Sequence, residues 1–152
     1  MNDITYPLTL YFDGACPLCV ADMDNLRLRD SAGRLRFIDA SAPGFDAAPA
    51  GTTVADLMAA MHARTADGRL LRGVAVFEAA YDAVGLHQVS GWLRSPTWRP
   101  LLERLYPFVA RHRQHLPRPL VRLLFGRALR RAAEQAAMRR CSADGACRID
   151  PQ

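Results

Sequence analysis

The sequence of 152 residues contains no lysine, so arginine supplies all 20 of its basic side chains. Together with the abundant alanine, this bias indicates a GC-rich bacterial genome rather than any mechanism. Also absent is any uninterrupted apolar run near the roughly 18 to 20 residues that a transmembrane helix needs. The first residues, MNDITYPL, lack the basic and apolar regions of a secretory signal. We therefore expect no transmembrane segment and a cytoplasmic location.

Cysteine is scarce, with four residues: Cys16, Cys19, Cys141 and Cys147. The thiol systems of the cytoplasm keep structural cysteines reduced, which argues against a disulfide framework in such a protein. We expect these four side chains to serve chemistry, either in catalysis or in metal binding.

The apolar pattern predicts a β-α-β unit followed by a β-β-α unit. Residues 6–12 (YPLTLYF) and 35–40 (LRFIDA) are typical of buried strands, and residues 15–29 between them carry a helical stripe. A loop over 42–53 and a helical turn near 54–58 precede a hairpin over 61–73 and a helix over 73–86. This order is that of a thioredoxin-like α/β domain. Two further helices, over 92–116 and 117–140, are predicted to break at Pro107 or begin at Pro119.

Two cysteines three residues apart, in the stretch DGACPLC (13–19), lie where the first strand passes into the first helix. A helix N-terminus presents unpaired backbone N–H groups that stabilise a thiolate, the attacking species in disulfide exchange. Pro17 suits the first helical position, and we expect it to aim Cys16 outward. We assign Cys16 as the nucleophile and Cys19, one turn further in, as the resolving thiol.

Asp13, three residues before Cys16, allows two interpretations. Its carboxylate can accept the proton of Cys19, directly or through water, if burial raises its pKa. Alternatively, because Asp-Gly is a common turn sequence, Asp13 caps the turn together with Gly14.

The residues YFDGACPLC resemble the DCC family of thiol-disulfide oxidoreductases, which is named for an Asp, Cys, Cys signature. The later stretches ADGRLLRGVAVFEAAYDAVG and YPFVARHRQHLP are also similar to that family's pattern. The resemblance implies a thioredoxin-like fold and disulfide exchange at a CxxC motif, with Asp13, Cys16 and Cys19 at the signature positions.

The prolines differ from those of thioredoxins in general. Thioredoxins place a cis-proline directly before the hairpin strand, whereas the nearest candidates here, Pro43 and Pro49, lie well upstream of Met61. We therefore expect substrate capture to differ, or the loop to fold back.

Charge divides the chain unevenly. Residues 1–91 carry 7 arginines against 11 acidic residues, whereas residues 92–140 carry 12 arginines against two glutamates. We predict a thioredoxin-like redox domain over 1–90, a basic helical extension packed on it over 91–140, and a cysteine-containing tail over 141–152. The arginines most simply form a solvated helix face, and no motif indicates a nucleic-acid partner. Peripheral membrane contact and docking of an acidic protein are the alternatives.

Cys141 and Cys147 flank Asp144-Gly145, a turn sequence that brings two sulfur atoms together. The pair is a candidate second redox couple that relays electrons to Cys16 and Cys19. Two alternatives stay open. Either all four cysteines bind one zinc ion, although the gap of five residues is wider than usual, or the tail thiols have no role.

Histidine and tryptophan give weaker signals. Trp92 and Trp98 indicate core or interhelical packing, and His112 and His115, three apart on a helix, are a candidate metal pair. We otherwise expect ordinary surface or core positions for the four histidines, which lack metalloprotease or zinc-finger spacing: His62, His87, His112 and His115.

Two functions from different classes are consistent with these features. The favoured one is a thiol-disulfide oxidoreductase that needs no cofactor and exchanges its CxxC pair with a protein or small-molecule disulfide. The alternative is a zinc-stabilised or redox-inert binding module whose arginine-rich helices dock an acidic partner or a membrane surface.

Overall fold

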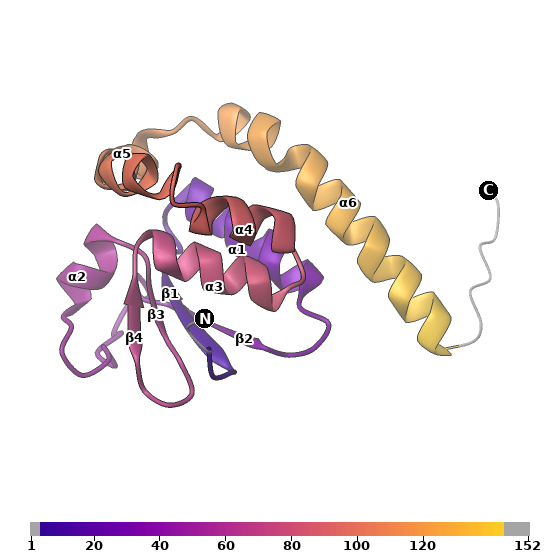
Figure 1. The fold of residues 1–152 in the computed structure, drawn as a ribbon, viewed down its shortest axis with the longest axis horizontal. Helices are drawn as coiled ribbons and strands as arrows, with labels where there is room; N and C mark the ends of the chain where they lie inside the picture. Colours follow the sequence, from indigo (N-terminus) through magenta and orange to yellow (C-terminus); the bar gives the residue numbers. More distant parts are fainter. Residues whose placement is uncertain (1–3, 145–152) are drawn as a thin grey trace.

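A four-stranded sheet with helices on both faces forms the body of the computed structural model, which describes residues 4–144 (Figure 1). Its strands are β1 (Leu8–Phe12), β2 (Leu35–Asp39), β3 (His62–Arg64) and β4 (Leu70–Arg72). The helices are α1 (Pro17–Arg29), α2 (Val54–Ala59), α3 (Val74–Ala83), α4 (His87–Arg94), α5 (Arg99–His112), the 3-10 helix η1 (Arg113–His115) and α6 (Arg118–Asp144). The predicted β-α-β and β-β-α order is confirmed.

The strand order β2-β1-β3-β4 places β1 in the interior of the sheet. β1 pairs in parallel with β2 and antiparallel with β3, and β3 and β4 form the predicted hairpin. The carboxyl ends of β1 and β2 and the start of β3 therefore meet at one edge of the sheet. The CxxC motif follows β1 at that edge.

Strand β1 supplies side chains to both faces of the sheet, as the two-residue period of a strand requires. Leu8, Leu10 and Phe12 belong to the larger core, which α1 and α3 cover. Tyr11 belongs to a smaller cluster on the other face with Leu57 of α2. This burial on both faces explains why the sequence of β1 is almost continuously apolar.

The helical extension differs from the prediction. The segment expected as one helix over 92–116 is split into α4, a turn and α5. Pro107 lies inside α5 without ending it, whereas Pro119 lies in the first turn of α6 as expected. Trp92 and Trp98 pack on one another with ring centroids 5.8 Å apart, yet 47% and 44% of their surfaces remain exposed. They make an interhelical contact and not a core.

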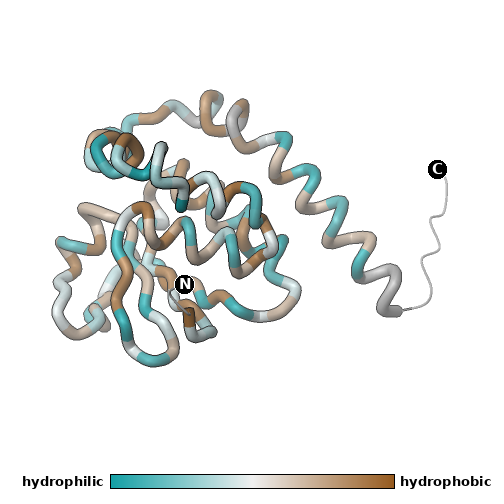
Figure 2. The backbone as a smooth tube through the Cα atoms, in the orientation of Figure 1, coloured by the Kyte–Doolittle hydropathy of each residue, from teal (hydrophilic) through white to brown (hydrophobic). Residues whose placement is uncertain are grey.

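Helix α6 lies against α1. The Arg29 side chain of α1 donates to the Ala128 carbonyl oxygen and to Gln135 Oε1, and Ala132 of α6 is fully buried. Hydrophilic residues recur along α6 among more apolar ones (Figure 2). Within residues 4–144, no helix is both long and apolar enough to cross a membrane.

Candidate active site

The turn between β1 and α1 is held by Asp39, the last residue of β2. Asp39 Oδ1 accepts a hydrogen bond of 2.9 Å from the Gly14 N–H, and a Cβ atom at position 14 would overlap the Asp39 carboxylate. Only glycine fits there without a shift of the carboxylate. The parallel pairing of β1 and β2 thus fixes the loop that delivers Cys16.

Cys16 is the N-cap residue of α1, and Pro17 is its first helical residue, as predicted. The Cys16 sulfur accepts a hydrogen bond of 3.4 Å from the Cys19 N–H. A side-chain acceptor at this position satisfies one of the N–H groups that the first turn leaves unpaired. The same donor is available to a thiolate at Cys16.

The expectation that Cys16 points outward is wrong. Its exposure to solvent is 0%, because η1 lies over it and the Arg113 carbonyl oxygen accepts the Cys16 S–H at 3.7 Å. Cys19 is half-buried, and both cysteines are free thiols. Backbone from the helical extension therefore covers the sulfur that we assigned as the nucleophile.

The two cysteines have opposite pKa shifts. A hydrogen bond from the Cys19 side chain lowers the pKa of Cys16 to about 6. Burial opposes this shift, and the Cys19 N–H and the Arg113 charge lower the pKa by smaller amounts. The pKa of Cys19 is raised, because its thiol donates to Cys16 and because it is buried. When the pair holds a single proton, Cys19 therefore carries it and Cys16 is the thiolate.

Asp13 is buried, with 1% of its surface exposed. Oδ1 accepts a hydrogen bond of 3.0 Å from the Ala15 N–H, and Oδ2 accepts one of 2.8 Å from the Gln114 amide. Arg113 Nη2 lies 3.9 Å from the same Oδ2. These contacts agree with the turn-capping interpretation, and a proton-transfer role for Asp13 stays a prediction.

Arg113 is the site residue that the sequence analysis missed. It is 5% exposed, its Nη2 donates to the Met58 carbonyl oxygen at 2.7 Å, and its charge lowers the pKa of Cys16. Among twelve arginines in the basic extension, composition alone did not distinguish it. Its place in YPFVARHRQHLP, one of the stretches that carry the family resemblance, was the available signal.

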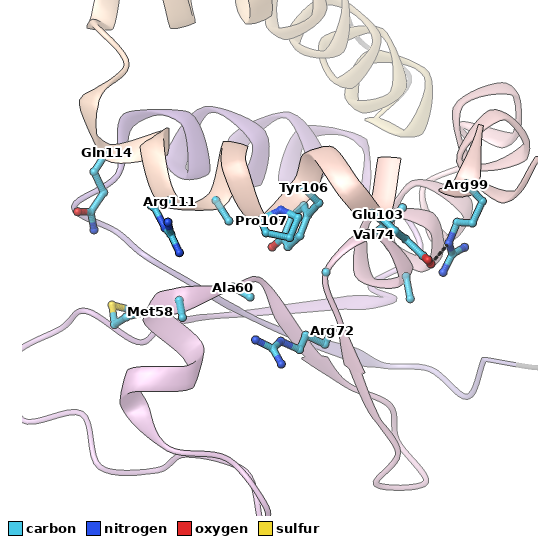
Figure 3. A pocket seen from close by; sticks show the side chains of 14 residues that line it. Met58, Ala60, Arg72, Val74, Arg99, Glu103, Tyr106, Pro107, Arg111 and Gln114 are labelled. Carbon is cyan, nitrogen blue, oxygen red and sulfur yellow. Dashed lines mark hydrogen bonds and ion pairs between the residues drawn. The ribbon is translucent and has the colours of Figure 1, made fainter. Parts of the chain in front are cut away.

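A groove of about 650 Å³ lies beside this cover, between the end of α2, the start of α3 and helix α5 (Figure 3). Arg111 projects into it from α5 and Arg72 from β4, and neither forms an ion pair within the described part of the chain. Met58 and Gln114, which hold η1 in place, also line it. The groove thus combines two arginine side chains with residues that hold the cover on Cys16 in place.

The remaining candidate residues do not join this site. His62 is buried in β3 with Nδ1 2.9 Å from the Ala60 carbonyl oxygen, and burial lowers its pKa. His112 Nδ1 lies 2.9 Å from the Phe108 carbonyl oxygen. Within residues 4–144, no three metal-ligating side chains are brought together. Cys147 lies outside the described residues, as does the side chain of Cys141 in α6, so the second redox pair stays a prediction.

The fold and the CxxC motif at the start of α1 define a thioredoxin-like protein. The family model of DCC1-like thiol-disulfide oxidoreductases matches residues 10–119, a range that runs from β1 into α6 and includes every site residue described above. The chain therefore belongs to the DCC1-like family, and the family supports a general thiol-disulfide oxidoreductase function.

One curated relative is the uncharacterized chloroplastic protein At5g50100 of Arabidopsis thaliana, which is 30% identical over 94 residues. The match covers 60% of this chain but 42% of the relative, so the chain spans less than half of that protein's length. No solved structure matches. The bacterial origin and cytoplasmic location expected from the sequence stay predictions.

Proposed function

We propose that this protein exchanges its Cys16 and Cys19 dithiol with the disulfide of a protein or small molecule, with Cys16 as the nucleophile. The observation that carries the proposal is the hydrogen-bonded pair at the N-terminus of α1, where donation from Cys19 lowers the pKa of Cys16 to about 6. At pH 7 such a group is mostly thiolate, whereas an ordinary cysteine, with a pKa of about 8.5, is mostly protonated.

The exchange takes two steps that leave the protein oxidised by two electrons. The Cys16 thiolate attacks one sulfur of the substrate, so that a mixed disulfide forms and the first substrate thiolate leaves. Cys19 then loses its proton and attacks Cys16 Sγ, so that the Cys16–Cys19 disulfide forms and the second substrate thiolate leaves. Another dithiol returns the pair to the reduced state.

Attack on a substrate requires η1 to move. The closed position rests on three contacts: the Cys16 thiol with the Arg113 carbonyl oxygen, Arg113 with the Met58 carbonyl oxygen, and Gln114 with Asp13. The first of these contacts requires a protonated Cys16. Ionisation removes the S–H and leaves a thiolate facing a carbonyl oxygen. We therefore propose that thiolate formation weakens the contact that holds η1 over Cys16.

The groove beside η1 is the proposed approach for the substrate. Arg72 and Arg111 face it without ion pairs among the described residues, which suits disulfides that carry carboxylate groups. Such a substrate would contact Met58 and Gln114, which hold the cover. A resting dithiol suits a reducing compartment, and we keep the cytoplasm as the proposed location.

The test is to trap the mixed disulfide in cells. In a Cys19→Ser variant, the resolving step is removed, so partner proteins should remain attached to Cys16 and be released by a thiol reductant. The control is Cys16→Ser with Cys19→Ser, which should capture none of them. Equal capture by both variants would contradict the proposal. Metal analysis that finds about one zinc per chain would instead favour the binding-module alternative.

A further inference from the structure

A second buried carboxylate lies near the resolving cysteine. Asp22 and Cys19 are three residues apart on α1, a spacing that places two Cβ atoms about 5 to 6 Å apart on one helix face. Both line one cavity of about 130 Å³ whose other walls are mostly apolar or aromatic. Cys19 and Asp22 therefore line one partly open cavity.

The Asp22 carboxylate is only half satisfied. It is 5% exposed, and its Oδ1 accepts a hydrogen bond of 2.6 Å from the Tyr81 hydroxyl. Its Oδ2 is buried and has no hydrogen-bond partner among the described residues. An unpaired carboxylate oxygen in an apolar cavity costs folding free energy, which calls for a reason other than stability.

The chemistry of disulfide exchange supplies that reason. Cys19 carries the proton of the pair and must lose it before it attacks Cys16 Sγ. We propose that Asp22 is the proton acceptor for Cys19 in this step, an inference that rests on the proposed function. The proton passes from Cys19 Sγ to Asp22 Oδ2, directly or through water in the cavity, while the Cys16–Cys19 bond forms and the bond from Cys16 to the substrate breaks. The departing substrate thiolate takes up a proton from solvent.

The protonation behaviour of Asp22 suits this role. Burial raises the pKa of Asp22 to about 6, although the Tyr81 hydrogen bond lowers it. A base whose pKa lies near the working pH is mostly ionised at pH 7 yet still binds a proton readily. The cavity exceeds the roughly 10 to 15 Å³ that one water molecule requires, and it has polar groups to hold it.

Asp13, the acceptor considered from the sequence, is placed differently. Each of its oxygens already accepts a hydrogen bond, from Ala15 and from Gln114, and Arg113 lies near Oδ2. The Asp13 charge acts on Cys19, but a proton arriving at Asp13 would share oxygens that these donors already occupy. Asp22 Oδ2 has no such donor among the described residues.

The pKa of Asp22 is raised by burial and lowered by the Tyr81 hydrogen bond, and the other groups that face the cavity come from several elements. From α6 the wall is the uncharged Phe125. The titratable or charged groups at the cavity are Cys19 on α1, Tyr81 on α3, Tyr106 on α5 and Arg113 on η1, and Arg29 on α1 acts on Tyr81.

The experiment separates the two steps with DTNB, an aromatic disulfide that releases coloured thionitrobenzoate. In a background with Cys141→Ser and Cys147→Ser, the first release reports attack by Cys16 and the second reports resolution by Cys19. Asp22→Asn should slow the second release at pH 7 by about a hundredfold, with the first release unchanged. In the parent, the rate of the second release should rise with pH through about 6, and Tyr81→Phe should move that midpoint upward because the hydroxyl lowers the pKa of Asp22.

Controls keep the two proposals apart. Asp24→Asn, on the same helix but paired with Arg27 at the surface, should leave both releases unchanged. Cys19→Ser should give the first release alone, and a parent without two releases would contradict the proposed function itself. A second release equally fast in Asp22→Asn and Asp24→Asn overturns the role of Asp22, as does equal slowing of both releases. If Asp22→Asn fails to fold, an unmoved midpoint in Tyr81→Phe overturns it.

Discussion

Two cysteine–aspartate pairs near the start of α1 lie in opposite environments. At the N-terminus of the helix, which we call the mouth although η1 covers Cys16, Cys16 and Asp13 lie among polar donors: the Cys19 N–H, the Ala15 N–H, the Gln114 amide and the Arg113 guanidinium. At the interior end, Cys19 and Asp22 line an apolar cavity in which one hydroxyl is the partner of the carboxylate.

This difference decides how each group handles a proton. Donors at the mouth favour the thiolate of Cys16, and the interior favours the protonated thiol of Cys19 and raises the pKa of Asp22. Under the two proposals made above, two cysteines and two aspartates take four different roles within ten residues of sequence. Roles of this kind follow from solvation and hydrogen bonding rather than from residue type.

The largest expected effect comes from removing the sulfur atoms themselves. Cys16→Ser should abolish the reduction of a disulfide, because no thiolate remains at the helix N-terminus, while Cys19→Ser should retain one stoichiometric attack without turnover. Glutathione released from oxidised glutathione without added reductant measures both: two thiols are expected per parent chain, one from Cys19→Ser and none from Cys16→Ser, each without Cys141 and Cys147. Release in Cys16→Ser equal to that of the parent would remove the distinction between mouth and interior.

Arg113→Met tests the charge at the mouth. Loss of the guanidinium should raise the pKa of Cys16, because the Arg113 charge lowers it, and loss of the bond to the Met58 carbonyl oxygen should loosen η1. The rate of Cys16 alkylation by iodoacetamide, measured against pH, separates these effects. The midpoint of the rate profile reports the pKa of Cys16, and the plateau rate at high pH reports how often η1 exposes the sulfur. Arg111→Met, whose side chain faces the groove instead, is the matched control and should leave the midpoint near 6. An unmoved midpoint in Arg113→Met would show that the charge does not act on Cys16.

Asp22→Asn tests the interior through stability. The folded state holds the pKa of Asp22 at about 6, against about 3.8 for the unfolded chain, so the free energy of unfolding falls as pH rises between these values. The free energy of unfolding of the variant should therefore exceed that of the parent by up to about 3 kcal/mol at pH 7, and this difference should vanish below about pH 4. Chemical denaturation at both pH values measures it. A variant that is less stable at pH 7 would show that the ionised carboxylate makes favourable contacts.

The sequence was sufficient where a local pattern sets the structure. Strand β1, the position of Cys16 as the first cap of α1, Pro17 at the first helical position and the hairpin at Asp67-Gly68 all follow from neighbours within a few residues. The interpretation of Asp13 as a turn residue has the same local basis, because its carboxylate accepts the N–H two residues ahead.

The sequence was insufficient where the site is closed by residues about a hundred positions away. The cover on Cys16 depends on how α5 ends and where η1 lies, and the split between α4 and α5 was not predicted. The sequence does not mark Asp22 as a site residue, because a charged residue in a helix ordinarily lies on a solvated face. Its buried carboxylate contacts Tyr81, which lies 59 positions away in the sequence, and no local pattern encodes that contact.

The smallest expected effect comes from removing the hydrogen bond between Gln114 and Asp13. Gln114→Ala removes one hydrogen bond to a buried carboxylate, worth about 1 kcal/mol to the closed position of η1. A loss of that size raises the population of the open position about fivefold, so alkylation of Cys16 should accelerate by a similar factor at every pH. The midpoint should stay near 6, since Gln114 carries no charge and is not among the groups that set the pKa of Cys16. Alkylation of parent and variant side by side decides the point: an unchanged rate would mean that η1 does not limit access, and Cys16 would then be reached by another route.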